Sequence, residues 1–372
     1  MARPAPAYDV LAAARSFALP AEPVSFARWG SGHINDTFAV TLRGGRRVIL
    51  QRINTDVFRD PEGVMANIGR VTRHLAAKLA DRPEAARLSL TLIPSRDGRD
   101  FLRDGDGRCF RAYEFIDRAR SFDVLASPRQ ATEAAKAFAT FQWLLADLPG
   151  PRLVETIPDF HHTRKRFEAF ARAVGRDARN RAKEAAPEIA FALSREPLVD
   201  GLLRPLAEGL LAERATHNDT KLNNVLFDEA TGEGLAVVDL DTVMPGLFLY
   251  DFGDMVRAAV SPAAEDERDL SKVEASEPVF EGLVRGTVAV LGNDLPPADR
   301  ERLVLAGKVI TLEIGLRFLT DHLDGDVYFR VHREGHNLDR ARTQFALVRS
   351  LEEKDERLSA IVESVAGCGG AG

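Results

Sequence analysis

The chain has 372 residues and 45% apolar content, so it can bury a large core and is expected to form two lobes. A formal charge of −6 and a pI near 5.8, without a strongly basic segment, exclude nucleic acid as the main partner. Cys109 and Cys368 are the only cysteines, and their wide separation excludes a disulfide framework or zinc site and favours a reducing compartment.

The first part of the chain predicts a mostly antiparallel sheet with one long helix. After a short helix at 8–17, Gly30 and Gly32 lie between two strand-like runs. Small residues at such a turn let backbone N–H groups approach phosphate oxygens, although tight hairpins use the same pattern. The long helix covers residues 61–79, with Asp60 as N-cap and Pro61 at its first position. Further strands are expected at 47–53, 88–93, 101–102 and 109–116.

From Ser127 onward the chain is predicted to be mainly helical. Ser127 is a suitable N-cap, Pro128 begins the first helix, and Phe138, Phe141 and Leu145 repeat at helical spacing. Further helices are expected at 160–174, 197–211, 278–291, 298–323 and 338–365. A solvated loop rich in proline and acidic residues is expected at 261–277.

A polar loop between two short apolar strands is the centre of the sequence. It has the sequence HNDTKLNN at 217–224, and a second strand at 236–238 is followed by Asp239 and Asp241. If Asp219, Asn224 and Asp239 converge, one carboxylate can accept a hydroxyl proton while the other oxygens hold Mg2+. A polar β-hairpin with an acidic tip is the alternative. The ordered pattern resembles the catalytic centre of kinases, which carry a lysine where Lys221 stands.

The tripeptide Asp251-Phe252-Gly253 spells the metal-binding motif of protein kinases, but its spacing is wrong. Asp251 lies 32 residues after Asp219, whereas Asp239 lies 20 residues after it and follows an apolar strand, as the metal carboxylate does. Asp251 stands where a helix is expected to begin. We therefore interpret Asp251 as a helix cap or loop anchor.

Seven motifs between residues 25 and 350 resemble the aminoglycoside phosphotransferase and choline kinase branch of the kinase-like superfamily. Within that branch the chain looks most like the N-acetylhexosamine 1-kinases. The motifs are GSGHINDT at 30–37, ILQRIN at 49–54, IPDFH at 157–161, HNDTKLNN at 217–224, VDLDTVMPG at 238–246, YDFGD at 250–254 and RFLTD at 317–321.

The resemblance implies a two-lobed, protein-kinase-like α+β fold with ATP and Mg2+ in the cleft. The lobe at 1–116 would bind the nucleotide, and the larger, mainly helical lobe at 117–372 would carry the catalytic and acceptor residues. Asp219 is then the catalytic base, Asn224 and Asp239 hold Mg2+, and Asp241 is a second possible ligand.

The same family resemblance assigns residues of the first lobe to nucleotide binding. The 30–37 loop would cover the phosphates, and backbone groups around Glu114 to Ile116 would bond the adenine edge. Kinases place a lysine on the third strand and a glutamate on the helix; here the only candidates are Arg52 and Glu62. Both also have ordinary interpretations, as an exposed arginine and a first-turn glutamate. The loop residues assigned to ATP are Gly30, Ser31, Gly32, His33, Asn35 and Thr37.

Two polar groups are candidates for the acceptor site. Glu313, Arg317 and Asp321 recur every fourth residue on an otherwise apolar helix, and these side chains could line a cleft and bond sugar hydroxyls. The alternative is an i,i+4 salt-bridge ladder on a solvated face, worth a few tenths of a kcal/mol per pair. The second group is His161, Thr163 and Arg166.

Together these features predict an ATP- and Mg2+-dependent kinase that phosphorylates the anomeric hydroxyl of a hexose or N-acetylhexosamine. Aminoglycoside, choline or fructosamine phosphorylation and a catalytically silent binding module are the alternatives. No apolar run reaches membrane-spanning length, and residues 1–20 lack a compact apolar segment. We therefore expect a cytoplasmic monomer or homodimer of carbohydrate metabolism without nucleic-acid or membrane partners.

Overall fold

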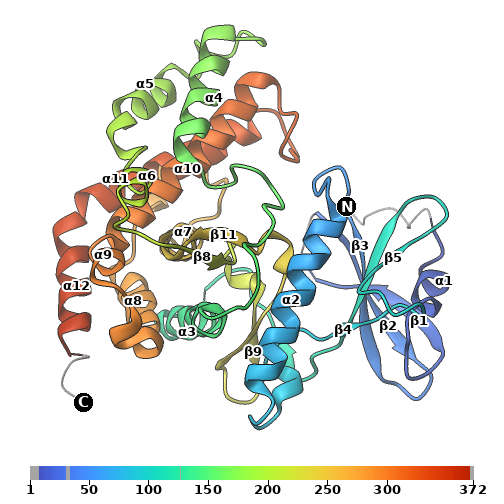
Figure 1. Cartoon of the computed structure of the whole chain (residues 1–372). Coiled ribbons are helices and arrows are strands. Elements are labelled where there is room, and N and C mark those ends of the chain that lie inside the picture. Colours follow the sequence, from blue (N-terminus) through green and yellow to red (C-terminus); the bar gives the residue numbers. More distant parts are fainter. Residues whose placement is uncertain (1–7, 31–33, 126, 369–372) are drawn as a thin grey trace.

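The computed structural model describes residues 8–30, 34–125 and 127–368 and shows two lobes (Figure 1). An antiparallel sheet with two helices forms the first lobe, and the second is mainly helical. The predicted α+β class with this division is therefore confirmed. The lobe boundary expected at residue 116 falls between the last strand of the first sheet and a short strand that pairs with the second lobe.

All strand pairs of the first lobe are antiparallel, in the order β1-β2-β3-β6-β4, with β5 also pairing with β6. The central strands β3 and β6 bring Gln51 opposite Arg111, and Arg52 opposite Phe110. Side chains directly opposite each other share one face of a sheet, so Gln51 and Arg111 face the same side. The strands are β1 (Pro23–Arg28), β2 (Asp36–Leu42), β3 (Arg47–Ile53), β4 (Leu92–Ile93), β5 (Leu102–Arg103) and β6 (Cys109–Glu114).

The two faces of this sheet are covered by different helices. Helix α1 (Val10–Arg15) packs with Phe17 on the face that carries Leu50 and Phe110. The opposite face meets α2 (Pro61–Leu79), whose first turn is capped by Asp60 as predicted. Period-two alternation along β3 thus directs Gln51 and Arg52 to opposite sides.

The second lobe is built around helices, none of which, among the described residues, is long and apolar enough to cross a membrane. Two small antiparallel sheets accompany these helices, β10-β9-β7 and β11-β8. The helices are α3 (Pro128–Leu145), α4 (Thr163–Arg176), α5 (Ala186–Ser194), α6 (Leu203–Ala207), α7 (Phe248–Ala259), α8 (Glu277–Leu291), α9 (Pro297–Arg300), α10 (Leu303–Asp324), α11 (His336–Glu353) and α12 (Asp355–Cys368). The strands are β7 (Ala119–Arg120), β8 (Glu213–Thr216), β9 (Val225–Asp228), β10 (Gly234–Val237) and β11 (Met244–Leu247).

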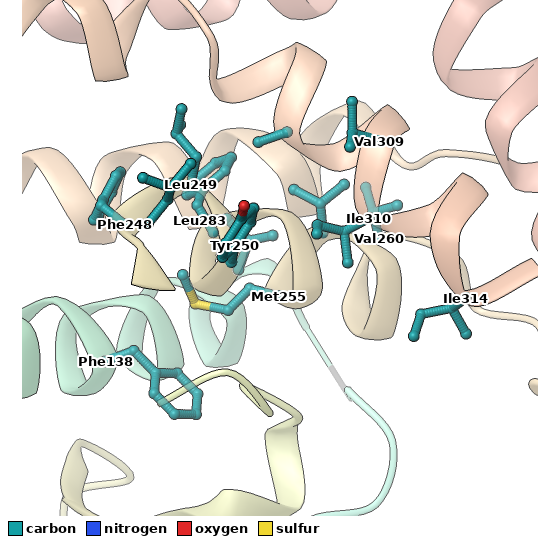
Figure 2. Close-up of a cluster of buried hydrophobic side chains, with 14 of the residues drawn as sticks. Phe138, Phe248, Leu249, Tyr250, Met255, Val260, Leu283, Val309, Ile310 and Ile314 are labelled. Atoms are coloured by element: carbon teal, nitrogen blue, oxygen red, sulfur yellow. The ribbon is translucent and has the colours of Figure 1, made fainter. Parts of the chain in front are cut away.

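Helix α7 lies in the core of the second lobe, where its side chains meet those of α3, α8 and α10 (Figure 2). Phe252 is fully buried and lies edge-to-face against Phe280 of α8. Each such buried aromatic stabilises the fold by about 1.5–3 kcal/mol relative to an exposed one. Close packing of α7 on α10 requires Gly253, because a Cβ there would meet the Ala306 carbonyl oxygen at 2.5 Å. The core therefore fixes where α7 points its polar side chains.

Several predicted helices are shorter or divided. The helix expected at 338–365 is interrupted at Lys354, whose ammonium donates to Glu274 and to the Ala275 carbonyl, so α11 and α12 are separate. The helix expected at 298–323 divides into α9 and α10. Within 197–211 only α6 is α-helical. This helix ends early because the Pro205 carbonyl accepts the backbone N–H groups of Leu210 and Leu211, which closes a turn. Helix α5 was not predicted.

Helices α3 and α8 approach closely at Gly286, and this contact generates a stability prediction. A Cβ at Gly286 would lie 2.8 Å from the Ala135 Cβ and closer still to the Thr132 carbonyl oxygen. We expect Gly286→Ala to lower the free energy of unfolding by about 1–3 kcal/mol, measured by urea denaturation. Gly175→Ala is the matched control, because Gly175 of α4 has open space around it and should gain about 0.4–1 kcal/mol. Equal stabilities of the two variants would contradict this packing.

Candidate active site

A cavity of about 540 Å³ lies between the two lobes, and both lobes contribute its walls. The sheet and the segment after it form one wall, and the 219–242 region forms the other. Lining residues of the first wall include Gly30, Asn35, Thr37, Ile49, Gln51, Arg111, Tyr113, Glu114, Phe115 and Ile116. Those of the second include Asp219, Lys221, Asn224, Leu226, Val238, Asp239 and Asp241.

The 217–224 loop is held at the cavity by two aspartates of α7. The Asp251 carboxylate accepts the backbone N–H groups of His217 at 2.9 Å and Asn218 at 2.6 Å. One turn later, Asp254 accepts the N–H of Thr220 at 2.8 Å. Burial raises the pKa of Asp251, while these donors stabilise its charged form. The interpretation of Asp251 as a loop anchor is therefore confirmed, and its carboxylate is committed to these backbone groups and to the Gln142 amide.

Asp219 faces the cavity with a cation beside it. Its carboxylate lies 2.7 Å from the Lys221 ammonium, and the Asn224 amide donates to its backbone oxygen at 2.8 Å. Burial alone would raise the pKa of Asp219, but Lys221 outweighs burial and holds this pKa below its ordinary value. Asp219 is thus a charged acceptor at neutral pH, and its side chain stays 24% exposed to the cavity.

Asp239 also lines the cavity, and within the described part of the chain its carboxylate has no hydrogen-bond partner or ion pair. It follows β10 in the left-handed region, with φ of 62°, a conformation uncommon outside glycine. Burial and the negative charges of Asp241 and Asp219 raise the pKa of Asp239 to about 6. Such a carboxylate is stabilised by a bound cation.

The chemistry of the donor set at Asp239 fits a hard divalent cation. Asn224 uses its amide N–H groups on Asp219, which leaves its amide oxygen for the cavity. Carboxylate and amide oxygens are the ligands that Mg2+ prefers, and substrate phosphates commonly complete its coordination. Among the described residues, no group of three or more His, Cys, Asp or Glu side chains is arranged so that it could hold a metal ion by itself.

Asp241 is engaged differently from Asp239, although both line the cavity. Arg111 donates to both Asp241 oxygens, at 2.9 Å from Nη2, and Asn35 donates to one of them. Asp241 is buried within this set of donors. A role as second Mg2+ ligand would thus require displacing ion-pair and amide donors.

Two assignments in the first lobe are not supported by the geometry. Arg52 lies on the sheet face away from the cavity, where its guanidinium donates to Asp36 at 2.8 Å. Glu62 is exposed and pairs with Arg103, as its first-turn position allows. Neither residue lies where a lysine–glutamate pair of kinase type would stand, because strand alternation and helix register direct both side chains elsewhere.

The glycine loop borders the cavity where the structure describes it. Gly30 has φ of +75°, which favours glycine, and together with Asn35 and Thr37 it lines the cavity. The predicted phosphate contacts Ser31, Gly32 and His33 lie outside the described residues.

Glu114, the last residue of β6, and Ile116 also line the cavity, beside Phe115, whose ring lies 5.1 Å from that of Trp29. Ile49 and Leu226 line the same cavity with apolar side chains. The Glu114 side chain pairs with Arg46. The Glu114 N–H also donates to the Thr91 carbonyl at 2.9 Å, so the adenine contact expected around 114–116 would have to use other backbone groups of this segment, and it is still a prediction.

A second polar cluster contacts the 217–224 loop at Asn218. His161 joins the Asn218 carbonyl at 3.0 Å and Glu313 of α10 at 2.8 Å, and Thr163 donates to the same carboxylate at 2.6 Å. Burial alone would lower the pKa of His161, but Glu313 outweighs it and raises that pKa. Glu313 is completely buried, so the solvated salt-bridge ladder considered from the sequence is wrong at this position.

Arg166 and Arg317 extend this cluster with positive charge. Arg317 lies against three aromatic rings, 5.2 Å from that of Phe160 and 5.8 Å from that of Tyr328, and Arg166 donates to the Phe160 carbonyl. Burial and the charge of Arg317 lower the pKa of Arg166. The region beside Glu313 is therefore cationic on balance.

Asp321 does not join these groups, although it shares their helix. Its carboxylate accepts the backbone N–H groups of Val327, Tyr328 and Phe329 and the amide of Asn337. With both oxygens used inside the fold, Asp321 holds the turn after α10, and its assignment to the acceptor is not supported. Holding that turn places Tyr328 beside Arg317.

Arg111 is a buried arginine in the wall of the cavity, and it was not among the residues predicted from the sequence. A signal was present, because in the strand CFRAYE at 109–114 Arg111 is a charge between apolar neighbours, separate from Glu114 at the end of the strand. A strand buried on both faces accepts such a charge only with a partner. That partner, Asp241, lies 130 residues away.

Comparison with known proteins bears on the fold of the chain. A model of the phosphotransferase enzyme family matches residues 25–283. The microcompartment-associated aminopropanol kinase is 20% identical, with a TM-score of 0.64 over 94% of this chain and 97% of that chain. An amicoumacin kinase solved with AMP-PNP and Ca2+ is 13% identical, with a TM-score of 0.58 over 91% and 92%. An aminoglycoside phosphotransferase from Alicyclobacillus acidocaldarius is 14% identical, with a TM-score of 0.56 over 98% of each chain. The predicted kinase-like fold is confirmed.

The different environments of Asp239 and Asp251 generate a paired prediction. Asp239→Ala should remove most of the gain in ATP affinity that Mg2+ provides, because it deletes an unpartnered oxygen ligand. Asp251→Ala should instead lower the free energy of unfolding by about 2–4 kcal/mol, because two buried N–H groups lose a charged acceptor. Calorimetric ATP titrations with and without Mg2+, and urea denaturation, measure the two effects. The reverse order of metal effects would show that Asp251 holds the metal.

Proposed function

The chain belongs to the phosphotransferase enzyme family, and on that premise we propose that it is an ATP- and Mg2+-dependent kinase acting on a small hydroxyl substrate. The observation that carries this proposal is the convergence of Asp219, Asn224 and Asp239 on one cavity. Asp219 and Asn224 come from the 217–224 loop, and Asp239 follows β10. Their side chains supply one charged proton acceptor and two oxygen ligands, which is what phosphoryl transfer requires of a protein.

In the proposed reaction, the acceptor hydroxyl oxygen attacks the γ-phosphorus of ATP while the bond to the β-phosphate oxygen breaks. Asp219 orients the hydroxyl and takes its proton, as its charged state and exposure to the cavity allow. Lys221 keeps this carboxylate ionised. Mg2+, when bound by Asn224 and Asp239, supplies positive charge to the phosphate oxygens.

The acceptor we propose is the anomeric hydroxyl of a hexose or N-acetylhexosamine. The resemblance to the N-acetylhexosamine 1-kinases supports this choice, and the contact of the second polar cluster with the 217–224 loop is consistent with it. His161 connects that cluster directly to the residue before Asp219. Arg166, Arg317 and Tyr328 provide donors and an aromatic surface of the kind that binds sugar hydroxyls and ring faces.

A cationic acceptor is the second candidate, and the kinases of similar fold motivate it, since one acts on aminopropanol. Charge argues against it here. The carboxylate of the cluster, Glu313, and that of Asp321 on the same helix are already committed to partners within the fold, while Arg166 and Arg317 would repel an ammonium group. A catalytically silent binding module is a third possibility, which the intact catalytic carboxylates oppose. A panel of sugars, amino alcohols and aminoglycosides with ATP separates all three.

Asp219→Asn should lower turnover by about 10²–10⁴-fold while leaving ATP affinity within about twofold. A carboxylate that orients the hydroxyl and accepts its proton acts mainly in the transition state. Steady-state kinetics and nucleotide titration measure the two quantities. The control is Asp324→Asn, which removes a partly exposed carboxylate paired with Arg176 and should change neither. Near wild-type turnover in Asp219→Asn would remove this residue from the mechanism.

The product should be a sugar 1-phosphate. A single aspartate can serve any hydroxyl within reach, so the regiochemistry comes from how the sugar is held. Anomeric phosphorylation blocks ring opening, and reducing-end reactivity should therefore disappear in step with ATP consumption. A product phosphorylated at C6 keeps its reducing end. Retained reactivity would refute the anomeric assignment and leave the kinase assignment intact.

A further inference from the structure

The nucleotide cavity contains a cation in an unexpected position. Arg111 of β6 is completely buried, yet it lines the cavity together with Asp219 and Asp239. A buried charge is expensive to remove from water and persists only with partners. The partners of Arg111 therefore indicate what this side chain does.

Gln51 is the first partner, and it occupies the cavity face of the third strand. The register sets Gln51 directly opposite Arg111, and its side-chain oxygen accepts the Arg111 Nε–H at 2.9 Å. The Arg111 Nη1 atom lies 3.9 Å from the Met65 sulfur of α2. The third strand thus presents a neutral amide to the cavity, and the charge comes from the neighbouring strand.

Asp241 is the second partner, and it belongs to the other lobe. Both terminal nitrogens of Arg111 donate to its carboxylate, and Asn35 donates to the same group from the glycine-loop side. Asn35 in turn accepts the Asn54 backbone N–H at 2.9 Å. A bidentate pair of this kind fixes the orientation of the guanidinium as well as its charge.

We propose that Arg111 contacts the nucleotide phosphates and that Asp241 is its counter-ion, rather than a second metal ligand. This inference rests on the proposed function of the same site. The pair takes the place of the lysine and glutamate that a third strand and helix would supply, with the anion contributed from the opposite lobe.

The arrangement of donors explains why phosphate is the expected ligand. A guanidinium has five N–H groups, and Gln51 and Asp241 use one on each of its three nitrogens. Because Nη1 also lies 3.9 Å from the Met65 sulfur, the second N–H of Nη2 is the one that can bond a phosphate oxygen without breaking an existing contact. Arg111 also stands among three cavity aspartates, so without it their charges would repel a polyphosphate.

The experiment compares ADP and adenosine binding by calorimetry in EDTA, which removes the metal from the comparison. The main variant is Arg111→Gln combined with Asp241→Asn, because it keeps the packing and hydrogen-bonding shape without leaving a buried charge unpaired. We expect ADP affinity to fall by about 10–100-fold, the range for lost charge-assisted hydrogen bonds, and adenosine affinity to stay within about twofold. Arg52→Gln, on the opposite sheet face, is the matched control and should change neither.

The single variant Asp241→Asn tests the counter-ion role. It keeps the cation and removes a negative charge, so metal-free ADP affinity should stay the same or increase, and Mg2+ should still strengthen ATP binding. Loss of the Mg2+ effect would show instead that Asp241 is a metal ligand. Circular dichroism confirms that each variant is folded before titration.

Other outcomes would overturn the assignment of Arg111. Unchanged ADP affinity in the double variant would mean that the pair only holds the lobes together. Equal weakening of ADP and adenosine would mean that it acts on the cavity shape rather than on phosphate. If wild-type protein binds no ADP, the proposed function fails as well; wild-type binding with an unaffected double variant refutes only the role of Arg111.

Discussion

The site depends on the hydrogen bonds between the Asp251 carboxylate and the backbone of the catalytic loop. Two consecutive N–H groups, those of His217 and Asn218, end on this one side chain. Asn218 has φ of 64°, a conformation that must be held by its surroundings. Because α7 is packed between α3, α8 and α10, the position of Asp251 is fixed by the core. The hydrophobic packing of the second lobe thereby sets the direction in which Asp219 points.

Buried ion pairs join elements of the protein whose relative positions would be less well defined by apolar packing alone. Arg111 and Asp241 join the two lobes at the cavity, and His161 and Glu313 join α10 to the catalytic loop. Buried ion pairs add little net stability, because desolvation offsets most of the Coulomb attraction. Their geometry is nevertheless exacting, since a displaced partner leaves a charge buried alone. Such pairs therefore define the relative positions of elements more than they stabilise the fold.

The sequence predicted most of the architecture because its signals were local. Asp60 and Ser127 predicted the starts of two helices as their N-caps. Short apolar runs with polar ends predicted the strands around 217–241. The break at Lys354 and the short helix α6 could not be predicted, because both depend on contacts with distant segments or on a turn that competes with helix. Arg52 was mistaken for the nucleotide cation because spacing does not say which sheet face a residue occupies; the register with β6 does.

Four aspartates of one region illustrate why environment, rather than motif, assigns roles. Asp251 accepts backbone donors, and Asp241 is covered by an arginine and an amide. Asp219 has a lysine beside it and remains open to the cavity.

Asp239 alone has no partner within the described residues, and its pKa is raised by burial and by the negative charges of its neighbours. These surroundings distinguish a loop anchor, a carboxylate paired with arginine, an ionised carboxylate facing the cavity and a carboxylate without a partner. The motif at 251–253, taken alone, would assign the metal to Asp251, which is the loop anchor. The carboxylate that still lacks a positive charge is the one most stabilised by binding a cation, and this physical criterion selects Asp239.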